Sequence, residues 1–129
     1  MNKLDKDSVL GISALLVHAA NIDEIYSDHE KKLVRDFIKS YLKNEDASEI
    51  LKKAEEIEKN SNQLLNFTNI IKKENNEIKS DIIKHLWKII ISDNSIDQYE
   101  SNLMRRVCGL IYFPDKLSAE IKHQILNKK

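Results

Sequence analysis

The sequence predicts an all-α protein with one domain, spanning residues 1–129. Apolar residues recur at helical spacing along almost the whole chain. Two Gly and one Pro provide too little turn material for a fold with many short strands. A chain of 129 residues is long enough to bury one core and short for two. We therefore expect about seven helices around a single core.

A sequence frame occurs twice in the chain. LVHAANIDEIYSDHEKKLVRDFI at 16–38 aligns with LWKIIISDNSIDQYESNLMRRVC at 86–108, so that Asp23 meets Asp93 and Glu30 meets Glu100. An internal repeat usually means one structural unit built twice. We expect two helix–acidic turn–helix units, at about 8–43 and 77–112, related by a pseudo-twofold axis. A helical insert at 46–75 would lie between them.

The first half of the chain predicts four helices. The first runs from about Ser8 to Asn21, with Asp7 or Ser8 as its cap, and the second follows the cap Ser27. A highly charged third helix covers Ala47–Asn60, and a short fourth one begins at Ser61 or Asn62. The apolar residues expected to face the core are Val9, Ile12, Leu16 and Ala19, then Leu33, Val34, Phe37, Ile38, Tyr41 and Leu42, then Ile50, Leu51, Ala54 and Ile57, and finally Leu64, Leu65, Ile70 and Ile71.

The second half predicts three helices. The fifth, at Glu77–Ser92, has apolar residues on two sides and should be a central, buried helix. The sixth follows the cap Asp97, and the last begins near Pro114–Ser118. The residues expected inside are Ile78, Ile82, Ile83, Leu86, Trp87, Ile89, Ile90 and Ile91, then Leu103, Met104, Val107, Cys108 and Ile111, and finally Leu117, Ile121 and Ile125.

Charge and hydropathy limit the kinds of partner and of cellular location that we expect for the chain. The 21 basic and 21 acidic residues are spread along the chain, which disfavours nucleic acid or an anionic membrane as partner. No apolar run approaches the roughly 18 residues of a membrane span, so we do not expect an integral membrane protein. The stretch VLGISALLVHAA resembles a signal-peptide core, but Asp5 and Asp7 precede it and Leu15–Ala20 belongs to the repeat. One cysteine, Cys108, fits a reducing compartment, and we expect a cytoplasmic protein.

The repeated turns carry two kinds of acidic residue. Ser27 with Glu30 and Asp97 with Glu100 match capping boxes, in which cap and glutamate bond each other's backbone N–H groups. For any one copy this structural role is the favoured interpretation. It leaves Asp23 and Asp93 unexplained. Each of these lies at the end of the preceding helix, where a carboxylate opposes the helix dipole.

A divalent cation would account for those two aspartates. Compared with the EF-hand spacing, each turn has only the second half of a calcium loop, so one copy cannot surround an ion. Two copies brought together could do so. Oxygen ligands alone would favour Ca²⁺, Mg²⁺ or Mn²⁺ over Zn²⁺. The candidate metal ligands are Asp23, Glu30, Asp93, Asp97 and Glu100.

The chain resembles the TerB-like tellurite-resistance family, specifically its small stand-alone bacterial members. The resemblance covers nearly the whole chain, through ALLVHAANID at 14–23, DEIYSDHE at 23–30, FTNIIKK at 67–73 and LWKIIISDNSIDQYESNLMRRVCGLI at 86–111. It implies about seven helices with internal pseudo-symmetry, an acidic cluster considered a divalent-cation site, and a stress-response setting with partner proteins. On this sequence the cluster maps to Asp23, Glu30, Asp93 and Glu100, beside Ser27 and Asp97. Both turns depart from the family pattern, because Glu24 and Asn94 replace its usual Gly.

The remaining chemistry-bearing residues have plain structural interpretations. Cys108 and Trp87 lie on apolar stripes and should be core residues, although Trp87 could line a groove. Isolated helical glycines, Gly11 and Gly109, usually permit close packing. No nucleophile is paired with a base. We expect a non-enzymatic binding or scaffold protein that acts with a protein partner or as a homo-oligomer. The alternatives are a metal-dependent hydrolase using the same carboxylates and a purely structural helical oligomer.

Overall fold

A computed structural model shows the fold. It describes residues 4–21, 26–61, 65–91 and 98–127, and for 98–101 the backbone alone. Within these ranges the chain forms helices and no strand, as expected for an all-α protein. The helices are α1 (Lys6–Ala20), α2 (Asp28–Tyr41), α3 (Ala47–Asn60), α4 (Leu65–Lys72), α5 (Asn76–Ile91), α6 (Gln98–Leu110) and α7 (Asp115–Asn127).

The start of the first helix differs from the prediction. Asp5, rather than Asp7 or Ser8, is the N-cap, and its Oδ1 accepts a hydrogen bond from the Ser8 backbone N–H at 2.7 Å. Asp7 instead lies in the first turn, where its charge complements the helix dipole. Asp5, Asp7 and Ser8 are three candidate caps within one turn, and they make the boundary ambiguous from sequence because each could accept a bond from a different N–H group.

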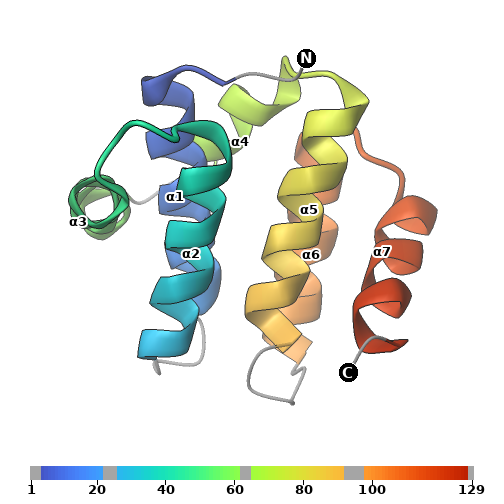
Figure 1. Ribbon diagram of the computed structural model, residues 1–129. Helices are drawn as coiled ribbons and strands as arrows, with labels where there is room; N and C mark the ends of the chain where they lie inside the picture. Colours follow the sequence, from blue (N-terminus) through green and yellow to red (C-terminus); the bar gives the residue numbers. More distant parts are fainter. Residues whose placement is uncertain (1–3, 22–25, 62–64, 92–97, 128–129) are drawn as a thin grey trace.

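The helices form two adjoining layers with flanking elements. In Figure 1, α2 and α5 lie side by side in front, with α1 behind α2 and α6 behind α5. Helix α7 runs along the outer side of α5, and α3 is seen end-on beside α1 and α2. Helix α4 crosses the top and contacts α1 and α6. The internal repeat stays a prediction, since the second turn, 92–97, lies outside the described residues.

Helix α1 is the most enclosed element of the described structure. It contacts α2, α3, α4 and α5. Leu15, Leu16 and Val17 are all buried although they face successive directions around the helix. The sequence predicts a central α5, which is confirmed, but it does not predict an equally central α1. The small residues Gly11, Ser13, Ala14, Ala19 and Ala20 are buried too, and they let the surrounding helices approach.

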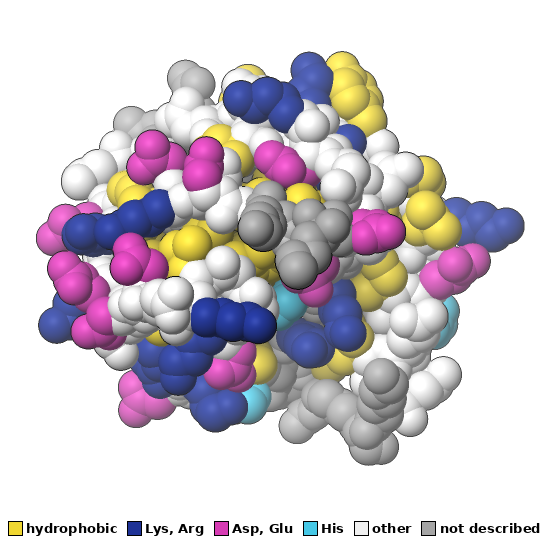
Figure 2. All heavy atoms as spheres, turned by 45° about the horizontal axis from the view of Figure 1, so that its top comes forward, with side chains coloured by type: hydrophobic (Ala, Val, Ile, Leu, Met, Phe, Trp, Pro, Cys, Tyr) yellow, Lys and Arg dark blue, Asp and Glu magenta, His cyan; other side chains and the backbone are white. Residues whose placement is uncertain are grey.

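Some residues predicted to face the core are exposed instead. Ile57 is 39% exposed, Leu65 46% and Leu117 42%. Each lies on an apolar stripe of an outer helix (α3, α4 or α7), where neighbours cover only part of the stripe. On the face shown in Figure 2, acidic and basic side chains are interspersed, in keeping with the balanced composition. No helix in the described ranges has the length and hydropathy needed to cross a lipid bilayer.

Helix α6 ends in a Schellman-type turn that has tyrosine in the position glycine usually occupies. Tyr112 has φ 60°, and the Phe113 N–H donates to the Cys108 carbonyl at 2.8 Å. A bulky residue in the left-handed region is strained, at a cost of order 1 kcal/mol or more. The Tyr112 ring is 70% exposed, with the Lys72 ammonium 4.9 Å from its centroid. This contact covers one face of a side chain that the turn holds outward.

The two glycines provide a matched stability test. Gly109→Ala should raise the free energy of unfolding by up to about 1 kcal/mol, because alanine is the better helix former and a Cβ there meets nothing within 4 Å. Gly11→Ala should gain less or destabilise, because its methyl group would overlap Cδ1 of Ile70. Urea denaturation of both variants measures the difference. Equal stabilisation would show that α1 and α4 are not packed as closely as described.

Candidate functional site at the first acidic turn

The start of α2 is held by a complete capping box, as predicted. Glu30 N–H donates to Ser27 Oγ at 3.1 Å, and Ser27 N–H donates to Glu30 Oε1 at 2.9 Å. The Ser27 hydroxyl also donates to Glu30 Oε1, at 3.1 Å. Glu30 is only 6% exposed, so a carboxylate is fixed within the fold at the positive end of a helix.

The other candidate cation ligands cannot be compared with the structure. Asp23, Asp93 and Asp97 lie outside the described residues, and so does the side chain of Glu100. Among the residues that are described, no group of three or more His, Cys, Asp or Glu side chains is arranged to hold a metal ion. Glu30 is therefore the one candidate whose position is known. It acts at least as a helix cap.

A cavity of about 290 Å³ opens where the end of α1, the start of α2 and the C-terminal half of α3 meet. Helix α3 contributes Glu55, Glu58 and Lys59 to its lining, and Lys31 comes from the first turn of α2. The full lining is Val17, Asn21, Tyr26, Lys31, Glu55, Glu58 and Lys59. We call it the corner cavity. Two carboxylates and two ammonium groups give it a balanced charge.

Glu58 anchors α3 to the end of α1. Its Oε1 lies 3.3 Å from His18 Nδ1, and its Oε2 accepts a hydrogen bond from Asn21 Nδ2 at 3.4 Å. His18 is in the last turn of α1 and Asn21 is the C-cap. A histidine in that position complements the negative end of the helix dipole when it is protonated. Glu58 thereby fixes one wall of the corner cavity against the end of α1.

Tyr26 brings a polar group into the same corner. Its hydroxyl oxygen is enclosed, and burial raises the pKa of this phenol well above its usual range, with the Glu55 carboxylate raising it further. The Lys31 ammonium lies 5.1 Å from the ring centroid, within cation–π range. The sequence identifies Tyr26 only as a large apolar residue of the repeat. Its interaction with Glu55 depends on α3 packing against α1 and α2, whereas its contact with Lys31 is local to the start of α2.

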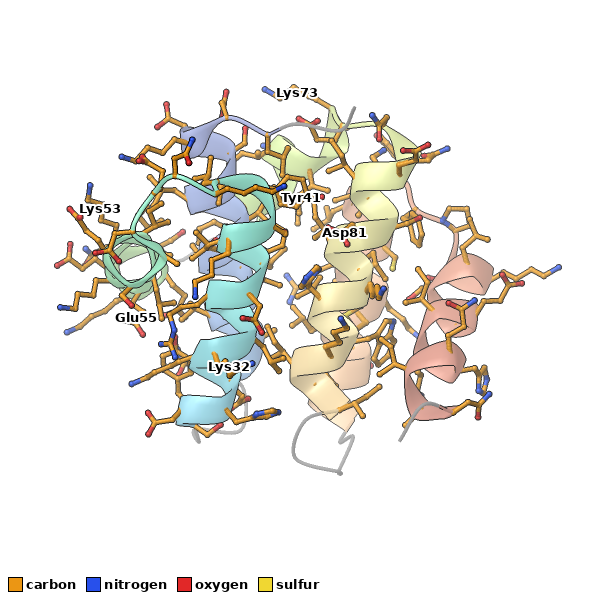
Figure 3. All side chains as sticks on the ribbon, viewed as in Figure 1. Lys32, Tyr41, Lys53, Glu55, Lys73 and Asp81 are labelled. Atoms are coloured by element: carbon orange, nitrogen blue, oxygen red, sulfur yellow. The ribbon has the colours of Figure 1, made fainter. Side chains whose placement is uncertain are left out.

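A second polar cluster joins the two halves of the chain. The Tyr41 hydroxyl donates to Asp81 Oδ2 at 2.7 Å, linking the end of α2 to α5, and Figure 3 shows these two side chains facing each other. His85 Nδ1 lies 2.8 Å from the Asp81 carbonyl oxygen, so that nitrogen carries the proton. The His85 ring meets Phe37 edge-on at 5.1 Å. Burial lowers the pKa of His85, and the Asp81 backbone carbonyl opposes that shift.

Sequence reasoning missed this cluster. The sequence pattern predicts Tyr41 only as a core residue and indicates no role for Asp81 or His85. Tyr41 and Asp81 are 40 residues apart, and neither belongs to the repeated acidic frame. The one local signal is the i, i+4 spacing of Asp81 and His85, which places both on one face of α5.

The fold and its capped turn define the class: a small all-α protein whose helix pair α1–α2 is joined through an acidic, capped turn. The chain belongs to the TerB family, because the model of that family, described as tellurite resistance protein TerB, matches residues 10–123. The match covers both acidic turns. No curated protein and no solved structure matches the chain.

The capping box can be tested by substitution at Ser27. Ser27→Ala should lower the free energy of unfolding by about 1–2 kcal/mol, since it removes the hydroxyl that accepts from the Glu30 N–H and donates to the buried Glu30 carboxylate. Ser48→Ala is the matched control, because Ser48 lies exposed in the first turn of α3, where the side chain of Asp46 is the cap. It should change stability by less than about 0.5 kcal/mol. Equal effects of the two changes in chemical denaturation would contradict the cap.

The partly buried position of His85 predicts that stability depends on pH. Its folded-state pKa lies below the value of about 6.5 that is usual for histidine, so as the pH falls below about 6.5 the unfolded chain binds a proton that the folded chain does not. Stability contributed by neutral His85 is present above that pH and decreases below it, by at most about 1.4 kcal/mol per pH unit. His85→Gln should flatten the dependence of melting temperature on pH between about 7 and 5. The exposed His29, changed to Gln, should leave it unaltered; identical slopes in all three proteins would contradict the prediction.

Proposed function

We propose that the chain is a non-enzymatic binding module of the TerB type, linked to stress response, that binds a divalent cation at its acidic turns and acts through a protein partner. Support comes from family membership across residues 10–123, which include both copies of the acidic frame. The proposed ligands are Asp23, Glu30, Asp93, Asp97 and Glu100. Their oxygen donors would suit Ca²⁺, Mg²⁺ or Mn²⁺.

The observation that carries the proposal is the fixed position of Glu30. Its carboxylate is nearly buried and held by two bonds from Ser27. A ligand that is already immobile loses little conformational entropy when it binds an ion. Because Glu30 Oε1 is occupied by the cap, ligation would use the same carboxylate alongside its structural role. The described residues do not complete a metal site, so the proposal depends on the four aspartate and glutamate side chains outside them.

A bound cation would supply charge neutralisation. Carboxylates gathered from two turns repel one another, and an ion between them would remove that repulsion. The surface around the turns would then differ in charge between the bound and the free protein. A protein partner that contacts this surface would therefore bind in a cation-dependent way.

A metal-dependent hydrolase is the second candidate, and one observation favours it. Such an enzyme needs a pocket beside its metal, and the corner cavity of about 290 Å³ lies next to the first turn. Hydrolysis of a phosphate ester that depends on Mg²⁺ or Mn²⁺, and is lost in Glu55→Gln, would replace the binding module by this enzyme.

Isothermal titration calorimetry tests the cation. Ca²⁺, Mg²⁺ or Mn²⁺ should give saturable heat at millimolar concentration or below, and the double variant Asp23→Asn with Asp93→Asn should lose it. The control Asp36→Asn with Glu120→Gln removes the same charge from exposed positions on α2 and α7 and should bind normally.

The melting temperature, measured with and without the cation, gives the result that would contradict cation binding. The cation should raise the melting temperature of the parent protein and not that of the Asp23→Asn, Asp93→Asn variant. If the double substitution changes the melting temperature equally with and without metal, and no heat is seen, the turns serve only as caps.

A further inference from the structure

A second cavity lies where α7 packs against α5 and α6. Its volume is about 540 Å³, and α5 contributes Trp87 while α6 contributes Met104 and Arg105. Helix α7 contributes Asp115, Ser118 and Lys122. We call it the Trp87 cavity. Its volume falls within the range of sites that bind small molecules.

The floor of the Trp87 cavity is rigid. Trp87 and Ser118 are each 5% exposed, and Trp87 Nε1 donates to Ser118 Oγ at 2.9 Å. This buried bond fixes the indole plane and joins α7 to α5. Met104, 2% exposed, adds an apolar side chain beside it. The floor of the cavity is therefore apolar and aromatic and is held in place by the buried bond, so a ligand would have to move only the flexible Lys122 side chain over the indole.

The rim of the cavity is positively charged. The Lys122 ammonium lies 5.2 Å from the Trp87 ring centroid, over the indole. The Arg105 side chain is exposed at the opening. Among the side chains that the structure describes, which exclude Glu100 on the same helix, no carboxylate lies within 4.0 Å of either cation, although Asp115 belongs to the same lining. The guanidinium group of Arg105 has a planar set of donors that matches carboxylate and phosphate oxygens.

We propose that the Trp87 cavity binds an organic anion, in which a carboxylate or phosphate group is attached to a small apolar or aromatic part. Arg105 and Lys122 bind the charged group, and Trp87 with Met104 contacts the apolar part. The same chemistry can come from a free metabolite or from an acidic residue beside an aromatic one in a partner protein. This site shares no residue with the acidic turns, so its test is independent of the proposed cation site.

The chain provides its own reporter for this site. Trp87 is the only tryptophan, so intrinsic tryptophan fluorescence reports on the cavity alone. Benzoate and phenyl phosphate are the probes for a free metabolite, and an end-blocked tetrapeptide with one Glu beside one Phe is the probe for a partner protein. Inorganic phosphate tests the charged group alone, and benzyl alcohol tests the apolar part alone.

Adjacent arginines on α6 give a matched pair of variants. Arg105→Gln and Lys122→Gln should weaken binding of the anionic probe about tenfold or more, as the loss of a charge-assisted hydrogen bond implies. Arg106→Gln should change the midpoint less than about twofold, because Arg106 is exposed on the same helix and does not line the cavity.

The outcomes distinguish a free metabolite from a partner protein as the source of the anion, and they show whether the proposal fails. Saturation by benzoate or phenyl phosphate supports a free metabolite, whereas saturation by the peptide alone supports a partner protein. The proposal is overturned if no anionic probe saturates the signal at millimolar concentration, if benzyl alcohol binds as tightly as benzoate, or if Arg105→Gln and Arg106→Gln have equal effects. Unchanged melting temperatures of these variants would show that a lost signal is not lost folding.

Discussion

The burial of α1 is the constraint on which the rest of the fold depends. An ordinary surface helix buries one stripe, but α1 has buried residues on all sides and needs neighbours around its whole circumference. Helices α2 and α5 cover part of it, and α3 and α4 cover the remainder. The segment 46–75 is therefore not a dispensable insert between two repeats. Without α3 and α4, residues such as Leu15 and Val17 would lose part of the cover that keeps them from water.

The sequence predicts local features well and long-range ones poorly, for a physical reason. The Ser27–Glu30 box and the bounds of α3 follow from residues within a few positions of each other. A periodic stripe shows which face of a helix is apolar, but not how many neighbours cover it, and so Ile57 and Leu117 were wrongly expected inside. The Tyr41–Asp81 bond depends on how α2 lies against α5. Of the candidate cation site, only the capping role of Glu30 could be compared with the structure.

The two cavities can be compared through the equivalent positions of the repeated sequence frame. Val17 and Trp87 occupy equivalent positions of the frame, and each lines a cavity between its helix and a flanking helix. The flanking helices are not equivalent. In Figure 1, α3 points toward the viewer, whereas α7 runs along α5. Whatever symmetry the frame carries does not include these outer helices, so the side chains they bring to the cavities are free to differ.

That difference determines the chemistry of each cavity. Around Val17, α3 contributes Glu55 and Glu58, whose charges are balanced by Lys31 and Lys59. Trp87 has a larger side chain than Val17. In its cavity, the two cations of Lys122 and Arg105 outnumber the single carboxylate of Asp115. A cavity lined by equal numbers of acidic and basic side chains has little electrostatic reason to bind an ion, whereas one whose described lining has an excess of cations attracts an anion. One frame, covered by two different outer helices, can thus hold a structural corner beside its acidic turn at one end of the sequence and an anion site at the other.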